Sequence, residues 1–510
     1  MKEQNKLLKN LGASILTYGM AFCISFFLSP YITKTLGVEA NGFVTLANQF
    51  VGYIALISVA LTSMSSRFIS ICVFQEDYKK ANVYFNSVIG ASAILALGLA
   101  IPLTVLVINL QRILNIDSGL ILDAKVLFSI VFINFLLGLL LEVFSIATFI
   151  TNRLHLSSLR SIEGNLIRSI LLVAAYAFLE AKMYYVAIGA VVSNLYLYLW
   201  NIHYTRKFMP QMHISSRYFK MDAIKELVQA GSWNIVIQLN NILNTGLDLL
   251  LSNWLLGEKL MGILAVAKTI PTSVTTMLNS VSGVFLPEMT RLYAKNDMDG
   301  LTRFMKRSIK ILALLFNIPV VFLIVYGSDF YRLWQPSLDA NMLQILCLLT
   351  ICTLLVSGST ASVFGVFTIT NCLRFHSLTS LACGAANVLL VVLALHFVSQ
   401  ETGIYIVAGV SSALIILRNY CITFPYAARC IKQKWYAFHM PSLMTILGAL
   451  AASAICVAIR VVFTPTNWFA LILSGILAAV VSLAVGLLVV LQRDDRAYIA
   501  RVIKSKFQKS

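Results

Sequence analysis

The chain has 510 residues, of which 59% are hydrophobic and 12% are charged, and its mean hydropathy is +0.84. A soluble protein carries about 25% charged residues, so this composition excludes a soluble globular domain and predicts a protein that crosses the membrane many times. The net charge of +18 does not indicate a nucleic-acid partner, because the basic residues gather between the apolar runs.

Fourteen apolar runs are long enough to cross a hydrocarbon core of about 30 Å. The clearest, from Phe469 to Leu491, contains no charged residue. The sequence therefore predicts an all-α polytopic membrane protein of about 14 transmembrane helices. In chain order the predicted spans are 11–33, 42–71, 84–109, 124–150, 156–179, 183–205, 224–256, 260–287, 309–328, 341–370, 377–398, 403–427, 441–462 and 468–491.

The positions of Lys and Arg predict how the spans are oriented. With the N-terminus in the cytoplasm, 29 of the 39 basic residues fall in cytoplasmic segments, seven in external loops and three inside helices. Cytoplasmic loops of membrane proteins carry an excess of Lys and Arg, so both termini are predicted to be cytoplasmic. The basic stretch 493–509 is predicted to lie along the inner membrane surface and to contact membrane lipid.

An internal repeat relates two parts of the chain at an offset of 220 residues. Gly37 and Gly42 correspond to Gly257 and Gly262, with the same leucine before the first glycine of each pair. Six predicted helices precede the basic loop 206–222, and the next six follow it. An even number of helices gives both halves the same orientation, which predicts two six-helix lobes related by a pseudo-two-fold axis along the membrane normal. The predicted division is an N-terminal lobe 1–210, a C-terminal lobe 211–430, and two extra helices with the tail at 431–510.

Polar residues recur along the predicted seventh helix, which returns through a hairpin at residues 256–259. Their steps of four, three, four and three residues place them on one face of a continuous α-helix. The members are Asn234, Gln238, Asn241, Thr245 and Asp248. Asp248 on this helix and Lys268 on the next lie about 13–17 Å from the hairpin, near the middle of the bilayer. Charge at that depth usually faces a polar cavity or a partner, so this helix pair is predicted to wall a central cavity.

Three cations lie inside predicted helices: Lys268, Arg168 and Arg418. One interpretation is that they form a cationic cavity that attracts a polyanion. The other is that each belongs to a structural ion pair, with Asp248 as the partner of Lys268 and Glu142 as the partner of Arg160 or Arg168. The acids Asp248, Glu142 and Glu163 are also candidates for binding a coupling ion, because desolvation raises the pKa of a carboxyl group.

The sequence contains no motif that indicates a chemical reaction. A GxxxxGK[ST] phosphate-binding loop is absent, so this polypeptide is not predicted to hydrolyse ATP. Cys347 and Cys352 are five residues apart, which fits no metal motif. No large external loop provides a catalytic domain of the kind expected for a polysaccharide polymerase or ligase. We therefore predict a non-enzymatic protein without a cofactor or a bound metal.

Residues 27–71 resemble the opening of the lipid-linked oligosaccharide flippases, which translocate O-antigen and other polysaccharide precursors. The most specific parts are TLGVEANGF at Thr35–Phe43 and SRFI at Ser66–Ile69. The length, the plan of six, six and two helices, and the predicted topology are similar along the whole chain. This family belongs to the superfamily that also contains the multidrug-and-toxin-extrusion transporters.

The resemblance implies a flippase in the inner membrane of a bacterium, acting by alternating access. The expected substrate is an undecaprenyl-pyrophosphate-linked oligosaccharide that moves from the cytoplasmic to the outer leaflet. The expected protein is a monomer, with a glycan polymerase or glycosyltransferases as candidate partners. The alternative of the same fold is a cation-coupled multidrug exporter, which would favour an acidic, aromatic cavity over a cationic one.

Such a flippase needs groups that bind pyrophosphate and sugar. The three buried cations are the candidates for the pyrophosphate, and Arg67 at the predicted cytoplasmic end of the second helix is a candidate first contact. Asn234, Gln238 and Asn241 are candidates for hydrogen bonds to sugar hydroxyls. Contact between helices explains the same amide pattern, and a basic residue at a helix end also commonly anchors the membrane interface.

Overall fold

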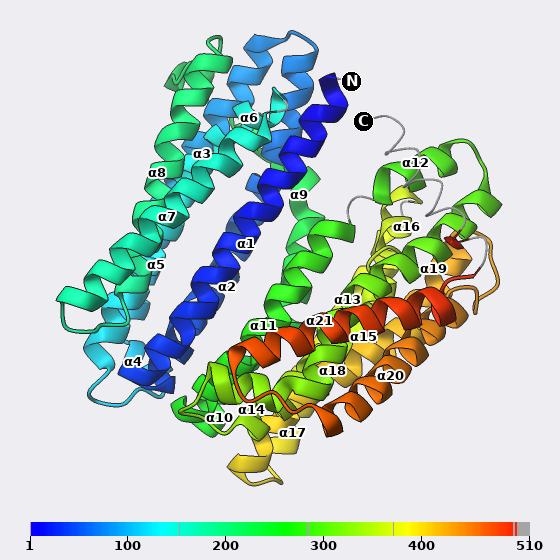
Figure 1. Ribbon diagram of the computed structural model, residues 1–510. Helices are drawn as coiled ribbons and strands as arrows, with labels where there is room; N and C mark the ends of the chain where they lie inside the picture. Colours follow the sequence, from blue (N-terminus) through cyan, green and yellow to red (C-terminus); the bar gives the residue numbers. More distant parts are fainter. Residues whose placement is uncertain (1, 152, 283–284, 371, 493–494, 497–510) are drawn as a thin grey trace. The chain divides into compact units, whose positions relative to one another are not determined.

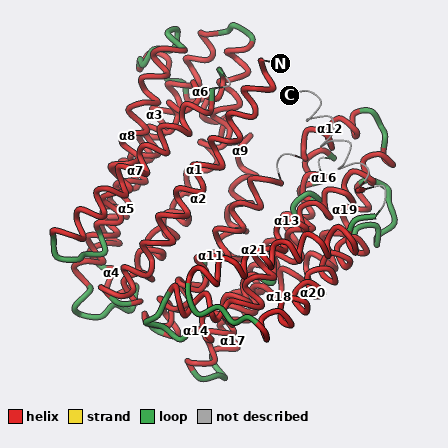
Figure 2. Tube along the Cα trace, viewed as in Figure 1, coloured by secondary structure: helices red, strands yellow, loops and turns green. Residues whose placement is uncertain are grey.

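The structure is a computed structural model that describes residues 2–151, 153–282, 285–370, 372–492 and 495–496. Every regular element in these ranges is a helix (Figure 2). The chain divides into two compact units, Met1–Ala265 and Val266–Ser510, which we call the first and second units. Of the predicted membrane-surface stretch 493–509, only Asp495 and Arg496 lie within the described residues.

The first unit contains ten α-helices, three short 3-10 or π turns and the start of an eleventh α-helix (Figure 1). Their bounds are α1 (Lys2–Leu36), α2 (Val38–Phe74), α3 (Tyr78–Ile108), α4 (Leu110–Ile113), α5 (Ile121–Leu141), η1 (Glu142–Ser145), α6 (Ile146–Ile150), α7 (Leu154–Phe178), α8 (Tyr185–Phe208), η2 (Ser216–Tyr218), α9 (Met221–Asn241), η3 (Ile242–Gly246), α10 (Asp248–Leu256) and α11 (Glu258–Ser282).

The second unit takes the remainder of α11 and the elements that follow it. Their bounds are α12 (Leu286–Ala294), α13 (Met298–Trp334), α14 (Ala340–Ile351), α15 (Thr353–Thr360), α16 (Phe364–Ile369), α17 (Leu373–Leu395), α18 (Gln400–Arg418), η5 (Asn419–Thr423), α19 (Phe424–Cys430), α20 (His439–Val462), α21 (Trp468–Val485) and η6 (Gly486–Val490).

Twelve helical stretches of the described residues are long and apolar enough to cross a membrane, which confirms an all-helical, multi-pass membrane protein. Two of the fourteen predicted spans are not among them. The segment 224–256 is divided between α9, the π turn η3 and α10, so it forms no single long apolar helix. The segment 11–33 lies inside α1, and its membrane crossing stays a prediction, as does the three-part division of the chain.

The glycines of the sequence repeat adopt matching conformations and meet in the first unit. Gly37 and Gly257 precede α2 and α11 with φ of 90° and 92°, a region that residues with a Cβ rarely adopt. Five residues later, a Cβ placed on Gly42 would lie 2.8 Å from Gly262 Cα. A Cβ on Gly262 would lie 2.3 Å from the Val38 carbonyl oxygen. Glycine at both positions therefore lets α2 and α11 touch backbone to backbone.

A second close approach attaches α9 to α2. A Cβ placed on Gly231 would lie 1.9 Å from the carbonyl oxygen of Ala60, so only glycine fits without moving a backbone. Asn234 Nδ2 donates to Ser63 Oγ at 2.8 Å, and Gln238 Nε2 donates to the Gly52 carbonyl at 3.3 Å. Two of the three candidate sugar-binding amides therefore make contacts between helices.

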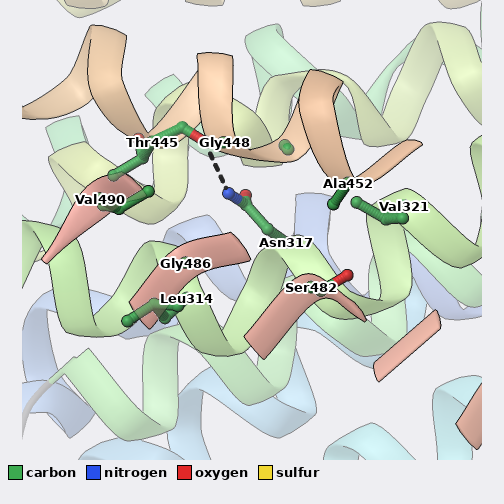
Figure 3. Close-up of a pocket in the computed structure, with 10 residues that line it drawn as sticks. Leu314, Asn317, Val321, Thr445, Gly448, Ala452, Ser482, Gly486 and Val490 are labelled. Carbon is green, nitrogen blue, oxygen red and sulfur yellow. Dashed lines mark hydrogen bonds between the residues drawn. The ribbon is translucent and has the colours of Figure 1, made fainter. Parts of the chain in front are cut away.

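In the second unit, α20 and α21 pack against α13 around a cavity of about 10 Å³ (Figure 3). Asn317, at the centre of α13, donates from Nδ2 to the Thr445 carbonyl of α20 at 3.0 Å. Gly448 leaves room for Val490, whose side chain would lie 2.6 Å from a Cβ placed on that glycine. Gly486 leaves room for Leu314, whose side chain would lie 1.8 Å from a Cβ placed there. Small residues and polar contacts such as that of Asn317 therefore hold α20, α21 and η6 against one another and against α13.

The end of the chain is attached to α13 by ionic contacts. Asp495 accepts from Lys310 Nζ at 2.7 Å and from Arg307 Nε at 3.2 Å. The Lys310 side chain is only 6% exposed. Burial raises the pKa of Asp495, but the hydrogen bonds from Lys310 and Arg307 outweigh this effect, so the pKa lies below its usual value. A lowered pKa means that folding favours the carboxylate form.

This contact predicts a loss of stability in acid. The contribution of Asp495 should be complete above its unfolded-state pKa of about 3.9 and should disappear as pH falls through the lower folded-state pKa. Asp495→Asn should therefore lower the melting temperature in detergent at pH 7, and the gap from wild type should close as the medium is acidified below about pH 4. An equal gap at pH 7 and pH 3 would contradict the assignment.

Candidate substrate and ion site

Arg168 lies on α7 and packs its stem against α8 in the first unit. A Cβ placed on Gly189 of α8 would lie 3.1 Å from Arg168 Cγ and 3.5 Å from Leu172 Cγ. The guanidinium Nε is buried and has no hydrogen-bond partner. Within the described ranges, Arg168 has no ion pair with an acid. It is a partly buried cation whose charge is not balanced by a neighbouring carboxylate.

Glu163 and Arg160 form a network one to two turns before Arg168. Arg160 Nη1 donates to Glu163 Oε2 at 2.5 Å, and the hydroxyl of Tyr196 donates to the same oxygen at 2.5 Å. Arg160 Nε donates to Tyr204 at 3.1 Å, and the guanidinium lies 4.1 Å from the Trp200 ring centroid. Glu163 therefore has an arginine partner on its own helix. Arg160 pairs with this acid, three residues away, rather than with Glu142.

Glu142 lies where α5 passes into η1 and is largely exposed in the structure. Its charge is close enough to act on Tyr198 of α8. Tyr198 is nine residues from Gly189, which is about 13.5 Å of helix rise from the point where Arg168 packs. No ion pair of Glu142 occurs among residues that the structure describes, so the predicted pairing with Arg168 is not formed.

The predicted polar face of residues 234–248 is interrupted. The α-helical hydrogen bonding ends at Asn241, and the π turn η3 separates it from α10, which begins at Asp248. A π turn has a wider hydrogen-bond spacing and changes the direction of the side chains that follow. Asn241 is accordingly exposed, whereas Asp248 is 2% exposed. The prediction of one continuous face was wrong because it assumed an unbroken α-helix.

Arg67 and Lys268 complete the set of predicted cations. Arg67 is exposed on α2, seven residues before that helix ends at Phe74. Lys268 is half-buried on α11, beside Ala267, whose carbonyl accepts from the Tyr331 hydroxyl at 3.2 Å. Asp248 belongs to the first unit and Lys268 to the second, and the ion pair between them stays a prediction.

Arg418 ends α18 in the second unit and is 8% exposed. It donates to Ser380 Oγ of α17 and, at 3.4 Å, to Asn419 Oδ1, and both partners are neutral. Its Nε has no hydrogen-bond partner. His376 of α17 is close enough to interact with this charge, and its ring stacks on Phe367 with centroids 4.5 Å apart. Arg418 has no carboxylate partner within the part of the chain that the structure describes.

The structure therefore separates the candidate charges into two kinds. Glu163 forms an ion pair with Arg160, whereas Arg168 and Arg418 have no ion pair with an acid among the described residues. Removing a guanidinium from water is costly unless an anion or a full set of hydrogen bonds compensates it. Each unit thus holds one cation that an anionic ligand would stabilise.

Sequence reasoning missed several residues around these cations. Arg160 was considered only as a partner for Glu142, although its spacing of three from Glu163 on one helix was a usable signal. Ser380 and His376 were found only in the structure, because they lie on another helix, where Ser380 precedes Arg418 by 38 residues. Asn419 directly follows Arg418, so its place in the sequence was a usable signal. The π turn η5 that begins directly after Arg418 had no sequence signal.

Comparisons with known proteins agree with this architecture. Residues 124–331 match the model of a family described as "Polysaccharide biosynthesis protein". Along 501 residues, the chain is 27% identical to a protein of Bacillus subtilis named "Uncharacterized membrane protein EpsK", covering 98% of both chains.

Two solved structures show the fold. The lipid II flippase MurJ in an inward closed conformation has a TM-score of 0.68 at 15% identity, covering 93% of this chain and 98% of MurJ. An inward-facing multidrug resistance transporter of the MATE family, in the MOP superfamily, has a TM-score of 0.64 at 16% identity, covering 83% of this chain and 99% of the transporter. The resemblance predicted from residues 27–71 is confirmed.

Proposed function

We propose that this multi-pass membrane protein, which has the fold of the multidrug, oligosaccharidyl-lipid and polysaccharide exporters, is a flippase. Its substrate is an oligosaccharide linked to undecaprenyl pyrophosphate, the repeat unit of an O-antigen, a capsule or an exopolysaccharide. The protein moves this lipid from the cytoplasmic to the outer leaflet of the bacterial inner membrane by alternating access. The matched family supports a role in polysaccharide biosynthesis.

The observation that carries this proposal is the pair of unbalanced cations, Arg168 and Arg418. A pyrophosphate entering a low-dielectric cavity needs positive charge nearby, and a buried guanidinium without a carboxylate gains from receiving it. Guanidinium groups also bind phosphate oxygens in a two-pronged geometry that lysine cannot offer. In this mechanism Arg168 in the first unit and Arg418 and Lys268 in the second are separate candidate contacts for the pyrophosphate, each within its own unit, and Arg67 is the candidate for the first encounter.

The remaining candidates take supporting roles in the same mechanism. Asn234, Gln238 and Asn241 offer amides to sugar hydroxyls when α9 separates from α2 during the transport cycle. Asp248 is the leading candidate to bind a coupling ion, because it is the most deeply buried of the three acids. Glu142 and Glu163 are the alternatives, although Glu163 must first leave Arg160.

A cation-coupled multidrug exporter is the second candidate, since a MATE transporter has the same fold. Such a protein would bind cationic drugs, which a carboxylate attracts and a guanidinium repels. The unbalanced charges described here have the opposite sign. The cation pattern therefore favours an anionic substrate over a cationic drug.

The test uses cells that lack this protein. We expect undecaprenyl-pyrophosphate oligosaccharide to accumulate on the cytoplasmic leaflet and surface polysaccharide to disappear, with drug sensitivity unchanged. Wild-type protein should remove the accumulated lipid-linked oligosaccharide and restore surface polysaccharide, whereas Lys268→Ala and Arg168→Gln should do neither. The exposed control Lys79→Gln should behave as wild type. Normal surface glycan together with heightened drug sensitivity would overturn the flippase and favour the exporter.

A further inference from the structure

An apolar groove of about 510 Å³ runs between α1 and α7 of the first unit. Met20, Cys23 and Phe27 line it from α1, and Leu172, Val173 and Ala177 line it from α7. Phe27 and Val173 are 72% and 70% exposed, so the groove is open rather than filled by neighbouring side chains. Because α7 is a candidate membrane span, the surroundings of the groove are hydrocarbon rather than water.

The hydroxyl groups of the groove lining already have partners. Ser169 Oγ donates to the Asn165 carbonyl at 2.9 Å, which keeps it on its own helix. Tyr31 donates to the Tyr176 carbonyl at 3.4 Å, and Tyr176 donates to the Lys182 carbonyl at 3.2 Å. A sugar or a polar drug would lose hydrogen bonds to water, and these hydroxyls, whose hydrogens are already donated, could replace them only as acceptors. A hydrocarbon chain has no such loss.

A cation adjoins the groove. Arg168 directly precedes Ser169, and its stem lies beside Leu172, where both side chains approach Gly189. The guanidinium Nε of Arg168 has no partner, as described above. An apolar groove next to an unbalanced cation matches a molecule that carries an anionic head on a hydrocarbon chain.

We propose that this groove holds part of the isoprenoid chain of the substrate while its pyrophosphate lies at Arg168; this inference rests on the proposed function. Lipid tails are as apolar as the groove, so entering it brings no large hydrophobic gain. The preference for the isoprenoid arises from van der Waals packing of its branched chain and from tethering by the bound head. The groove positions the chain, and the cation supplies the affinity.

Cys23 is a native reporter inside the groove. It is a free, exposed thiol, and Cys352 of the second unit is a free, partly buried thiol outside the candidate residues and far from the groove in sequence. The experiment places the full-length protein in lipid nanodiscs and follows alkylation of each cysteine by a membrane-permeant maleimide, read by peptide mass spectrometry. Undecaprenyl phosphate is compared with phosphatidylglycerol, which has a similar head charge on acyl chains.

We expect undecaprenyl phosphate to slow labelling of Cys23 at least fivefold and to leave labelling of Cys352 unchanged. Equal slowing by both lipids would overturn the isoprenoid assignment in favour of a general acyl-chain groove. Slowing by neither lipid would overturn the groove as a chain-binding site. A parallel change at Cys352 would mean that the lipid perturbs the whole membrane, which also contradicts the proposal.

Two matched substitutions separate this inference from the proposed function. Val173→Trp fills the groove, whereas Ile170→Trp adds the same side chain on the same helix at a 67% exposed position outside the groove lining. Val173→Trp should abolish the protection of Cys23 and reduce surface polysaccharide at least fivefold, and Ile170→Trp should do neither. If deleting the protein impairs surface polysaccharide but Val173→Trp does not, the groove fails and the flippase stands. If deletion itself leaves the glycan unchanged, the proposed function fails.

Discussion

Arg418→Gln should reduce substrate translocation at least tenfold while leaving the protein as stable as wild type or more so. Arg418 is buried, bonds only to neutral groups and has an unpartnered Nε. Removing a buried, unbalanced charge relieves a desolvation cost, so the fold loses little. The substrate pyrophosphate, however, loses its cationic contact in the second unit. An arginine that lowers the stability of the fold and is nevertheless present is expected to bind the substrate.

Two companion variants make this prediction specific. Arg418→Lys retains the charge without the planar fork and should leave an intermediate activity. Arg429→Gln removes an exposed arginine 11 residues further along the chain, near the end of α19, and should leave translocation unchanged. Surface polysaccharide reports activity, and thermal unfolding in detergent reports stability. A drop of several degrees for Arg418→Gln would show that the arginine is structural and would contradict its assignment to the substrate.

Asp329→Ala should produce a marked loss of stability without altering the candidate site. The Asp329 side chain, on α13, is 4% exposed. It accepts a hydrogen bond from Arg332 and forms an ion pair with Arg460, whose Nη2 lies 2.7 Å from Asp329 Oδ2. Arg460, on α20, also donates to the Val325 carbonyl at 2.6 Å. Removing one partner of a buried pair costs about 3–5 kcal/mol, and the partial exposure of Arg460 reduces this to about 2–3 kcal/mol. We expect the melting temperature to fall by about 5 °C.

The double variant Asp329→Leu with Arg460→Leu distinguishes the ion pair from simple side-chain loss. Replacing both charges with apolar groups should recover much of the lost stability, because no uncompensated charge remains. Glu401→Ala, at an exposed position in the first turn of α18, should leave the melting temperature within about 1 °C of wild type. If the double variant is as unstable as Asp329→Ala, packing rather than charge is what Asp329 provides.

Composition and local backbone chemistry predicted much of the architecture. Apolar length identified the spans, because crossing hydrocarbon requires about 20 apolar residues regardless of fold. The hairpin at Gly257 was predictable from its glycine, because this residue type readily adopts a positive φ such as the 92° found between the two helices. The repeat, with only four identities between residues 36–47 and 256–267, also includes positions where the structure depends on glycine.

The candidate site was less accessible to sequence reasoning. Helical spacing assigned residues 234–248 to one face, but the π turn η3 changed the direction of Asp248 relative to Asn241. Such a turn depends on packing with other helices, which single-helix periodicity does not describe. One partner of Arg418, Ser380, likewise comes from α17, so the neutral surroundings of this arginine became visible only in the folded structure.

The contact between Gly42 and Gly262 also bears on how such a chain arises. If the two repeats descend from one segment that paired with its own copy, this glycine would have faced its own image across the symmetry axis. One mutation in that ancestor would then have introduced two side chains into a space that holds none, a much harsher test than in a fused chain. After fusion of the two copies, each glycine can be substituted independently of the other. Proteins that descend from such a duplication can therefore differ between their two repeats at a contact where the ancestor had to keep both residues identical.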